Sequence, residues 1–196
     1  MKMTISLLQS YDWLKICPDF LKAKAKDQII GMLKKEPFDN KAVARGNAYE
    51  DIINKALREG KPVPEELECL RGKRQQAWIK ALTIKNYTFR GKLDYDDAEC
   101  IWDLKTTKRF DVASYYDKKQ HLVYCLAENK PKFVYKVAVF NNDTGLEPTA
   151  IETIPIDVDL KKAELDIYAA ISEFENWLRR ENLWDLYFDS FNGGNA

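Results

Sequence analysis

The chain has 196 residues, of which 45% are hydrophobic and 32% charged, and its 31 basic residues balance 31 acidic ones. This composition excludes an intrinsically disordered chain, and the length favours one domain with a single sizeable core. No apolar run approaches the ~20 residues of a membrane-spanning helix, and the first residues form no signal-peptide core, so we expect a cytoplasmic protein encoded by a bacterium or a phage.

The first 80 residues are predicted to be mainly helical. Three helical stretches are expected: residues 1–35 with a break at Cys17 and Pro18, residues 40–58, and residues 64–80. Gly60 and Pro62 end the second stretch because neither residue type continues a helix well. Pro64 opens the third at a position where a backbone N–H is not needed.

After residue 80 the pattern changes to that of strands, which are rich in β-branched and aromatic residues. Strands are predicted at residues 82–84, 87–89, 100–104, 132–140 and 150–155, with a turn at residues 141–145. Residues 111–128 return to a helical period. A last long helix begins near Asp159, and one stripe of it faces the core: Leu160, Ala163, Ile167, Ile171, Phe174 and Leu178.

This order of elements predicts the fold class. Helices, a hairpin, a helix and further strands imply an α/β fold with a mixed central sheet flanked by helices. We expect a single domain over residues 1–190, with a helical part (1–80), a sheet part (82–156) and a C-terminal helix (159–190). Residues 191–196 are expected to form a flexible tail.

Basic residues gather in three stretches: Lys22, Lys24, Lys26, Lys34 and Lys35; Arg71, Lys73, Arg74 and Lys80; and Lys105, Lys108, Arg109, Lys118 and Lys119. Local patches of this kind suffice for phosphate contacts even when the net charge is zero. A solvated helix face is the simpler interpretation of the first stretch, whereas phosphate binding is favoured for the third.

The cysteines are scattered at Cys17, Cys69, Cys100 and Cys125 and form no Cys-x-x-Cys pair. This spacing argues against a zinc site, and a disulfide framework is not expected in a cytoplasmic chain. We expect buried, reduced thiols.

A candidate metal site lies in the predicted hairpin. Residues two apart on a strand share a face, so Asp103 and Lys105 point one way while Trp102 and Leu104 are buried on the other side. Considered alone, this tripeptide also describes ordinary polar residues on a solvated strand face.

The length of the hairpin connection decides whether Asp94 joins them. If residues 96–99 form a four-residue connection, Tyr95 pairs with Cys100, and Asp94 lies roughly 7–8 Å from Asp103 on the same face. A connection one residue longer or shorter would put Asp94 on the opposite face.

Two carboxylates at that separation can bind one hard cation. Magnesium takes oxygen ligands and keeps several waters, so it needs few protein ligands. A bound ion of this kind lowers the pKa of a water and offsets charge on phosphate oxygens. A neighbouring lysine, here Lys105, can orient the water, so the arrangement suits phosphodiester hydrolysis.

A carboxylate interrupts the apolar stripe of the helix predicted at residues 40–58. That stripe consists of Gly46, Glu50, Ile53 and Leu57. A carboxylate at such a position is costly unless it meets a cation, and a metal beneath Glu50 would resolve the conflict. The alternative is that Glu50 lies at the edge of the stripe and reaches water.

Three residues spaced four apart, Tyr116, Gln120 and Tyr124, share one face of the helix predicted after the hairpin. A glutamine there can reach a phosphate or a water, and a tyrosine can stack on a base. The alternative is that both tyrosines are half-buried core residues.

In order and rough spacing, these residues resemble the motifs of the RecB-like PD-(D/E)XK nucleases, which include the lambda-type and mitochondrial exonucleases and the CRISPR-associated RecB-like nucleases. The matching motifs are Gly46-x-x-x-Glu50, Gly91-x-x-Asp94, Asp103-x-Lys105 and Gln120-x-x-x-Tyr124. Residues 6–9 and 17–20 resemble the N-terminal segment of the family, and the resemblance runs from residue 5 to about residue 140.

The resemblance implies a restriction-endonuclease-like core of order α-β-β-β-α-β, a Mg²⁺ or Mn²⁺ cofactor and a DNA substrate. It implies roles for these residues: Glu50, Asp94, Asp103 and the Leu104 carbonyl as metal ligands, Lys105 as the catalytic lysine, and Gln120 with Tyr124 as the last motif. The candidate DNA contacts around them are Arg45, Lys108, Arg109, Tyr116, Lys118 and Lys119.

The chain departs from the family pattern in two respects. Many RecB-like members have a histidine where Glu50 stands, and the single histidine here, His121, does not match that position. We interpret His121 as a helix-surface residue. The iron–sulphur members have three cysteines near the C-terminus, but no cysteine follows Cys125 in this chain, so we expect no cluster.

The leading hypothesis is therefore a metal-dependent DNA exonuclease or end-processing nuclease that acts in replication, recombination or repair. A structure-specific or site-specific endonuclease is the first alternative, and a non-catalytic DNA- or protein-binding module on a nuclease fold is the second. Because a lone small domain offers little surface to surround DNA, a homo-oligomer or a recombination-protein partner is also considered.

Overall fold

The computed structural model describes residues 1–37, 41–141 and 145–192. Residues 142–144 of the predicted turn and residues 193–196 of the predicted tail therefore lie outside the described part of the chain. None of the helices in the described ranges combines the length and apolarity that a bilayer crossing requires.

The N-terminal helices confirm the predicted break. Helix α1 (Ile5–Ile16) and helix α2 (Asp19–Leu33) are separated at Cys17 and Pro18. Thr4 caps α1, since its side-chain oxygen accepts a hydrogen bond from Leu7 N at 3.2 Å. A short strand, β1 (Lys2–Met3), precedes them and was not predicted.

The third predicted helix is wrong over most of its length. Helix α3 (Lys41–Arg58) ends as expected, but residues 64–80 form only a 3-10 turn, η1 (Glu65–Leu70), followed by strand β2 (Arg74–Gln75). Gly72, with φ of +77°, takes a left-handed conformation that ends the turn. The segment then gains ladder hydrogen bonds from a neighbouring strand, and this tertiary pairing outweighs its helical propensity.

The central sheet has the order β2-β5-β6-β7-β8. Its other strands are β5 (Tyr95–Asp96), β6 (Cys100–Thr107), β7 (Lys132–Val139) and β8 (Ala150–Asp157). Only the β6–β7 pair is parallel, so the sheet is mixed, as predicted. A smaller sheet joins β1, β4 (Tyr87–Phe89) and β3 (Leu82–Ile84).

The parallel pair requires a crossover, which the chain makes with two helices rather than the single predicted one. These are α4 (Ala113–Tyr116) and α5 (Lys119–Glu128). The C-terminal helix is likewise divided into α6 (Leu160–Arg180) and α7 (Trp184–Asn192), with Asn182 in a left-handed conformation between them.

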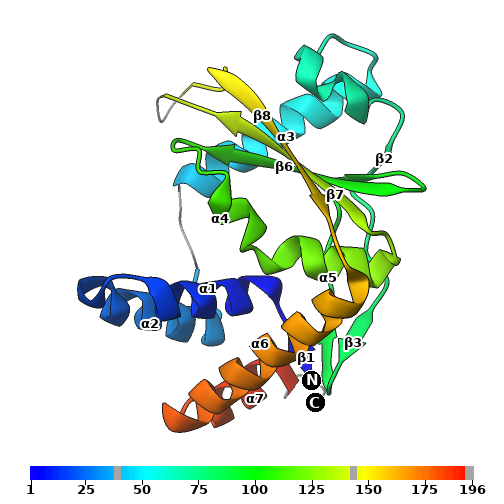
Figure 1. The fold of residues 1–196 in the computed structure, drawn as a ribbon. Coiled ribbons are helices and arrows are strands. Elements are labelled where there is room, and N and C mark those ends of the chain that lie inside the picture. The colour runs from blue at the N-terminus through cyan, green and yellow to red at the C-terminus, as the bar shows by residue number, and fades with distance from the viewer. Residues whose placement is uncertain (38–40, 142–144, 193–196) are drawn as a thin grey trace.

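Helices cover both faces of the central sheet (Figure 1). Helix α3 and η1 lie on one face, where Tyr49, Ile53 and Leu57 pack with Leu104. Helix α5 lies on the other face, and α1, α2, α6 and α7 pack beyond it in the lower half of Figure 1. The predicted stripe of α6 is buried from Ala163 to Leu178. The candidate site residues therefore lie between two separate hydrophobic clusters.

Candidate active site

The shortness of β5 creates the site. Strand β5 begins only at Tyr95, which pairs with Trp102, so β6 has no β5 residue beside it from Asp103 onward. The Asp94 carboxylate lies where the backbone of a longer β5 would pair with β6, and its Oδ2 accepts a hydrogen bond from Leu104 N at 2.8 Å. A side chain thus replaces one rung of the ladder, and it brings a carboxylate to the open edge of β6.

The predicted pairing of the hairpin is wrong, but Asp94 still lies on the predicted face of the sheet, the face of Asp103. Tyr95 pairs with Trp102 and Asp96 with Ile101, so the register is shifted by two residues from the expected pairing. A shift of two keeps every side chain on its face. Asp97 tightens the connection, since its Oδ1 accepts hydrogen bonds from the backbone N–H groups of residues 99 and 100.

Asp103 is the most buried of the predicted acids, with 1% of its surface exposed. Gln120 Nε2 donates a hydrogen bond to its Oδ1 at 2.6 Å. Lys105 Nζ lies 2.6 Å from its Oδ2 as an ion pair. The structure therefore brings residues of two predicted motifs, Asp103-x-Lys105 and Gln120-x-x-x-Tyr124, together at one carboxylate.

The charges in this group shift the pKa values of Asp94 and Lys105. Loss of hydration and the neighbouring charge of Asp103 raise the pKa of Asp94 well above its usual range. Burial acts against the charged form of Lys105, but the charges of Asp103 and Asp94 outweigh it and raise the pKa of the ammonium. The site therefore concentrates negative charge that one lysine only partly offsets.

Glu50 approaches from α3, and two amide side chains hold it. Gln76 Nε2 donates a short hydrogen bond to Glu50 Oε1, and Asn54 Nδ2 donates to the same oxygen at 3.4 Å. Tyr95 fixes Asn54 in turn, because its hydroxyl donates to Asn54 Oδ1 at 2.6 Å. The charge of Glu50 also contributes to the raised pKa of Asp94.

Sequence reasoning missed Gln76 and Asn54. Asn54 lies four residues after Glu50 on α3, a spacing that puts both on one helix face and could have identified it. Gln76 fell within the wrongly predicted helix. It adopts φ of 55°, a conformation that non-glycine residues rarely take outside turns and functional sites.

Gln120 and Tyr124 are both placed at the site by α5. Tyr124 donates a hydrogen bond from its hydroxyl to Lys92 O at 3.1 Å, and burial raises its pKa to about 12, so the hydroxyl stays protonated. The tyrosine ring packs on the backbone of Gly91. Gln120 therefore orients a carboxylate, while Tyr124 holds the segment that leads to Asp94.

Gly91→Ala should test that packing. An added Cβ would lie 2.8 Å from Tyr124 Cε1 and 2.9 Å from its hydroxyl oxygen, so the ring or the strand must move. We expect a loss of about 1–3 kcal/mol in the free energy of unfolding, measured by urea denaturation. Gly31→Ala in α2 is the control, since its Cβ meets only the flexible end of Glu36. Equal stability of the two variants would contradict the close contact.

His121 is not on the surface, so the sequence-based interpretation was wrong. The residue is 3% exposed, and its Nδ1 lies 3.3 Å from the hydroxyl of Tyr135. Burial, aided by the nearby charges of Lys119 and Lys118, lowers the pKa of the imidazole to about 4. The helix face that carries His121 packs against β7 because α5 is the crossover helix between β6 and β7.

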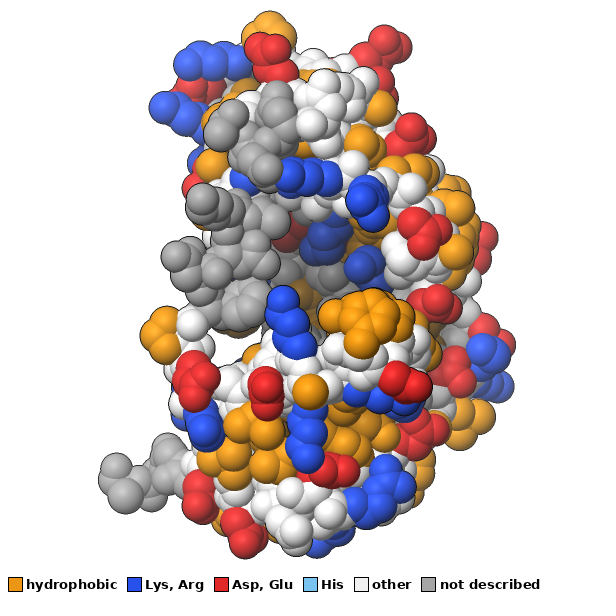
Figure 2. All heavy atoms as spheres, turned by 90° about the vertical axis from the view of Figure 1, so that its left-hand side faces the viewer, with side chains coloured by type: hydrophobic (Ala, Val, Ile, Leu, Met, Phe, Trp, Pro, Cys, Tyr) orange, Lys and Arg blue, Asp and Glu red, His pale blue; other side chains and the backbone are white. Residues whose placement is uncertain are grey.

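The predicted DNA contacts differ in exposure. Lys108, Arg109 and Tyr116 are exposed, and Lys118 and Lys119 are partly exposed. Tyr116, Lys118 and Lys119 line a cavity of about 650 Å³ beside α1. Figure 2 shows that one side of the molecule is hollowed near its middle, with Lys and Arg side chains around the hollow.

Arg45 differs from the other predicted DNA contacts because it is 7% exposed, and its guanidinium lies over the Phe140 ring at 4.8 Å.

The cysteines are free, and Cys17, Cys100 and Cys125 are buried as predicted. Cys69 is exposed, contrary to the expectation.

The donor set fits a hard divalent cation. Within the described ranges no three His, Cys, Asp or Glu side chains converge as a ready-made cluster. Asp94 and Asp103 nevertheless crowd their charges together, with Glu50 adding to them. Asp103 Oδ2 is buried and accepts no hydrogen bond of normal geometry from the described residues. Oxygen donors of this kind match an ion that keeps most of its water ligands.

Comparison with known proteins places the fold. No protein-family model matches the chain, and no curated protein sequence matches it. A protein assigned as an exonuclease from Eubacterium rectale has a TM-score of 0.61 at 15% identity, covering 93% of this chain and 82% of its own. A phage-related exonuclease from Haemophilus somnus 129PT has a TM-score of 0.52 at 16% identity, covering 92% and 96%.

A third solved structure, LHK-Exo in complex with dAMP, has a TM-score of 0.51 at 13% identity and covers 92% of this chain and 93% of its own. Identities this low establish the fold alone. The chain has the mixed α/β fold of these exonuclease structures, as the sequence predicted.

Proposed function

We propose that the chain is a metal-dependent DNA nuclease that uses Mg²⁺ or Mn²⁺ and acts at DNA ends in replication, recombination or repair. One observation carries the proposal: the Asp94 carboxylate lies at the open edge of β6 beside Asp103, whose other neighbour is the Lys105 ammonium. The exonuclease fold of the structural neighbours supports the same reaction class.

The metal would be held by Asp94 and Asp103, with Glu50 and the Leu104 carbonyl as further ligands. A divalent ion at such a site supplies an activated water and offsets charge on the phosphate. Gln120 fixes Asp103 through its hydrogen bond to Oδ1, while Oδ2 faces the Lys105 ammonium at 2.6 Å. Gln76 and Asn54 orient Glu50 in the same manner.

Lys105 would act on the reacting phosphate. Its raised pKa keeps the side chain protonated at neutral pH, and its ion pair with Asp103 fixes it at the site. An ammonium in that position orients the attacking water and stabilises negative charge that builds up on phosphate oxygens.

The phosphate contacts would come from the exposed cations near the site. Two of these cations, Lys108 and Arg109, follow β6, and two partly exposed ones, Lys118 and Lys119, lie at the start of α5. Tyr116 is exposed in the segment between them. The dAMP bound by LHK-Exo supports a nucleotide ligand for this fold. Arg45 is left out of this set because it is buried.

The direct test is a cleavage assay on end-labelled linear, nicked and covalently closed circular duplex DNA with Mg²⁺. We expect linear DNA to be degraded and closed circles to be spared, because action at ends requires an end. EDTA should abolish cleavage, and Asp103→Asn should reduce it at least ~100-fold. Asp51→Asn, an exposed neighbour of Glu50 on α3, is the matched control.

Each outcome separates one alternative. Cleavage of closed circles would identify an endonuclease. Absence of cleavage on every substrate by the wild-type chain, with either metal, would overturn the nuclease proposal in favour of a binding module.

A further inference from the structure

A two-stranded ribbon extends from the central sheet, beyond β2 and β5, toward the smaller sheet. Backbone hydrogen bonds hold it in an antiparallel arrangement that is irregular at Gln76, whose φ is 55°: Gln76 N to Asp94 O at 2.9 Å, Leu93 N to Ala77 O at 2.8 Å and Ile79 N to Gly91 O at 3.0 Å. Trp78 and Lys92 form a bridge pair in the same register. The catalytic Asp94 is thus one member of this ribbon.

The two faces of the ribbon differ sharply in environment. Ile79 and Leu93 are buried in the main core. Trp78 is 71% exposed, and its partner Lys92 is also exposed on the opposite face from those core residues. Trp78 is among the most exposed large hydrophobic side chains of the described residues, and its indole surface is open to a ligand.

This exposed face begins at the catalytic carboxylates. Gln76 is two residues before Trp78, and its side chain contacts Glu50. Asp94 is two residues after Lys92, across the ribbon from Gln76. Two residues of even a fully extended chain span only ~7 Å, so Trp78 lies no farther than that from Gln76, which contacts Glu50. That distance is comparable with the length of one extended nucleotide.

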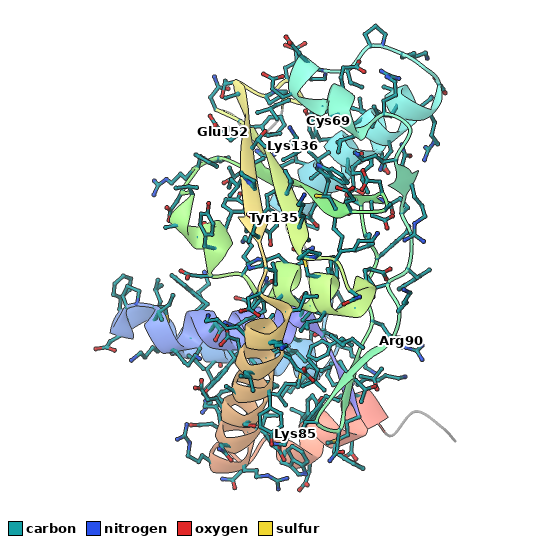
Figure 3. All side chains as sticks on the ribbon, turned by 45° about the vertical axis from the view of Figure 1, so that its right-hand side comes forward. Cys69, Lys85, Arg90, Tyr135, Lys136 and Glu152 are labelled. Atoms are coloured by element: carbon teal, nitrogen blue, oxygen red, sulfur yellow. The ribbon has the colours of Figure 1, made fainter. Side chains whose placement is uncertain are left out.

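Basic side chains flank the tryptophan. Lys92 lies across the ribbon from it, and the same register places Lys80 and Arg90 as the next pair outward; all three are exposed. Among the described residues, no carboxylate forms an ion pair with any of the three. Figure 3 shows Arg90 at the outer edge of the molecule, with its side chain directed away from the body. These cations are therefore available to a polyanion.

We propose that this face, defined by Trp78, Lys80, Arg90 and Lys92, binds a single-stranded stretch of the polynucleotide that enters or leaves the catalytic carboxylates. Trp78 stacks on a nucleobase, and the three cations contact the phosphates on either side. An aromatic platform between cations is the arrangement that binds single strands without regard to sequence, because every base offers a stacking surface. The link to cleavage, but not the binding itself, rests on the proposed nuclease function.

The test is the binding of a fluorescein-labelled dT₂₀ oligonucleotide, followed by fluorescence anisotropy in EDTA so that no cleavage occurs. Trp78→Ala should raise the Kd about ten-fold or more, and Trp78→Phe should keep it within about three-fold of the wild-type value. Phe20→Ala, which removes an aromatic side chain on α2 that is 83% exposed, is the control and should have no effect. Lys92→Ala should reduce the salt dependence of binding by about one phosphate contact.

A second oligonucleotide keeps the result specific to stacking. Replacing the bases of dT₂₀ by abasic sites should weaken binding to the wild type and leave binding to Trp78→Ala nearly unchanged. The proposal is wrong if Trp78→Ala binds dT₂₀ as tightly as the wild type. It is also wrong if that substitution changes the sedimentation mass and not the binding, since the face would then join two copies of the chain.

The two proposals can fail separately. Trp78-dependent binding in a chain that cleaves no DNA would support the ribbon face and contradict the nuclease. Normal cleavage by wild type together with unchanged dT₂₀ binding by Trp78→Ala would support the nuclease and contradict the ribbon face.

Discussion

Lys105→Met should lower the rate of DNA cleavage by at least ~100-fold while leaving the fold intact, because the substitution removes the ammonium that we propose stabilises charge on the reacting phosphate. Methionine keeps most of the length and apolar volume of the lysine stem. The measurement is single-turnover cleavage of linear DNA at saturating enzyme and Mg²⁺, which isolates the chemical step from binding and product release.

Lys85→Met provides a closely matched control. The Lys85 side chain is 28% exposed and forms an ion pair with Glu175 at 2.7 Å. The Lys105 side chain is 33% exposed and forms its ion pair with Asp103 at 2.6 Å. Both variants lose one lysine of similar geometry, but only one loses it at the site. Similar cleavage rates for the two variants would show that Lys105 has no catalytic role.

The same variant carries a second expected result, in stability. Without Lys105 the carboxylates of Asp94 and Asp103 lose their nearest cation, and an uncompensated charge of this kind costs about 1–3 kcal/mol or more. A bound divalent ion offsets that charge. Mg²⁺ should therefore raise the melting temperature of Lys105→Met by more than it raises that of Lys85→Met.

Local periodicity is what made the core of the site predictable. Asp103 and Lys105 share a face because a strand alternates, and Glu50 lies on the inner side of α3 because a helix repeats. Asp94 was placed on the correct face with the wrong partner. A two-residue shift in strand pairing does not change the face on which a side chain lies. The predicted placement of Asp94 beside Asp103 therefore did not depend on the exact pairing of Tyr95.

The remaining parts depend on tertiary pairing. Gln76 and Trp78 lie in a segment whose composition favours a helix, and only the ladder with residues 91–96 holds it extended. His121 was assigned to the surface as the simplest interpretation of a histidine that matches no family motif. Its burial follows from the packing of α5 against β7, which no spacing within the helix reveals.

His121 should make the protein lose stability as the pH falls from 7 to about 4. Its pKa is about 4 in the folded chain, against an ordinary value of about 6.5. Between those values the unfolded chain binds a proton that the folded chain excludes. The stabilisation is therefore complete above pH 6.5 and declines through the window, by about 3 kcal/mol in the free energy of unfolding at its lower end.

The difference between wild type and His121→Gln isolates this effect, because glutamine keeps a polar group near the Tyr135 hydroxyl but does not titrate. Asp96 and Asp97, whose pKa values are lowered, change stability in the same direction, whereas Asp94, whose pKa is raised, changes it in the opposite direction. Both contributions are common to the two proteins and cancel in that difference. Urea denaturation at pH 7 and pH 4.5 should show a smaller loss for the variant. Because the chain has one histidine, an NMR titration of its ring protons reports the same pKa directly. A pKa near 6.5 would mean that the imidazole is hydrated, as a surface residue would be, and that α5 does not pack on β7 as described.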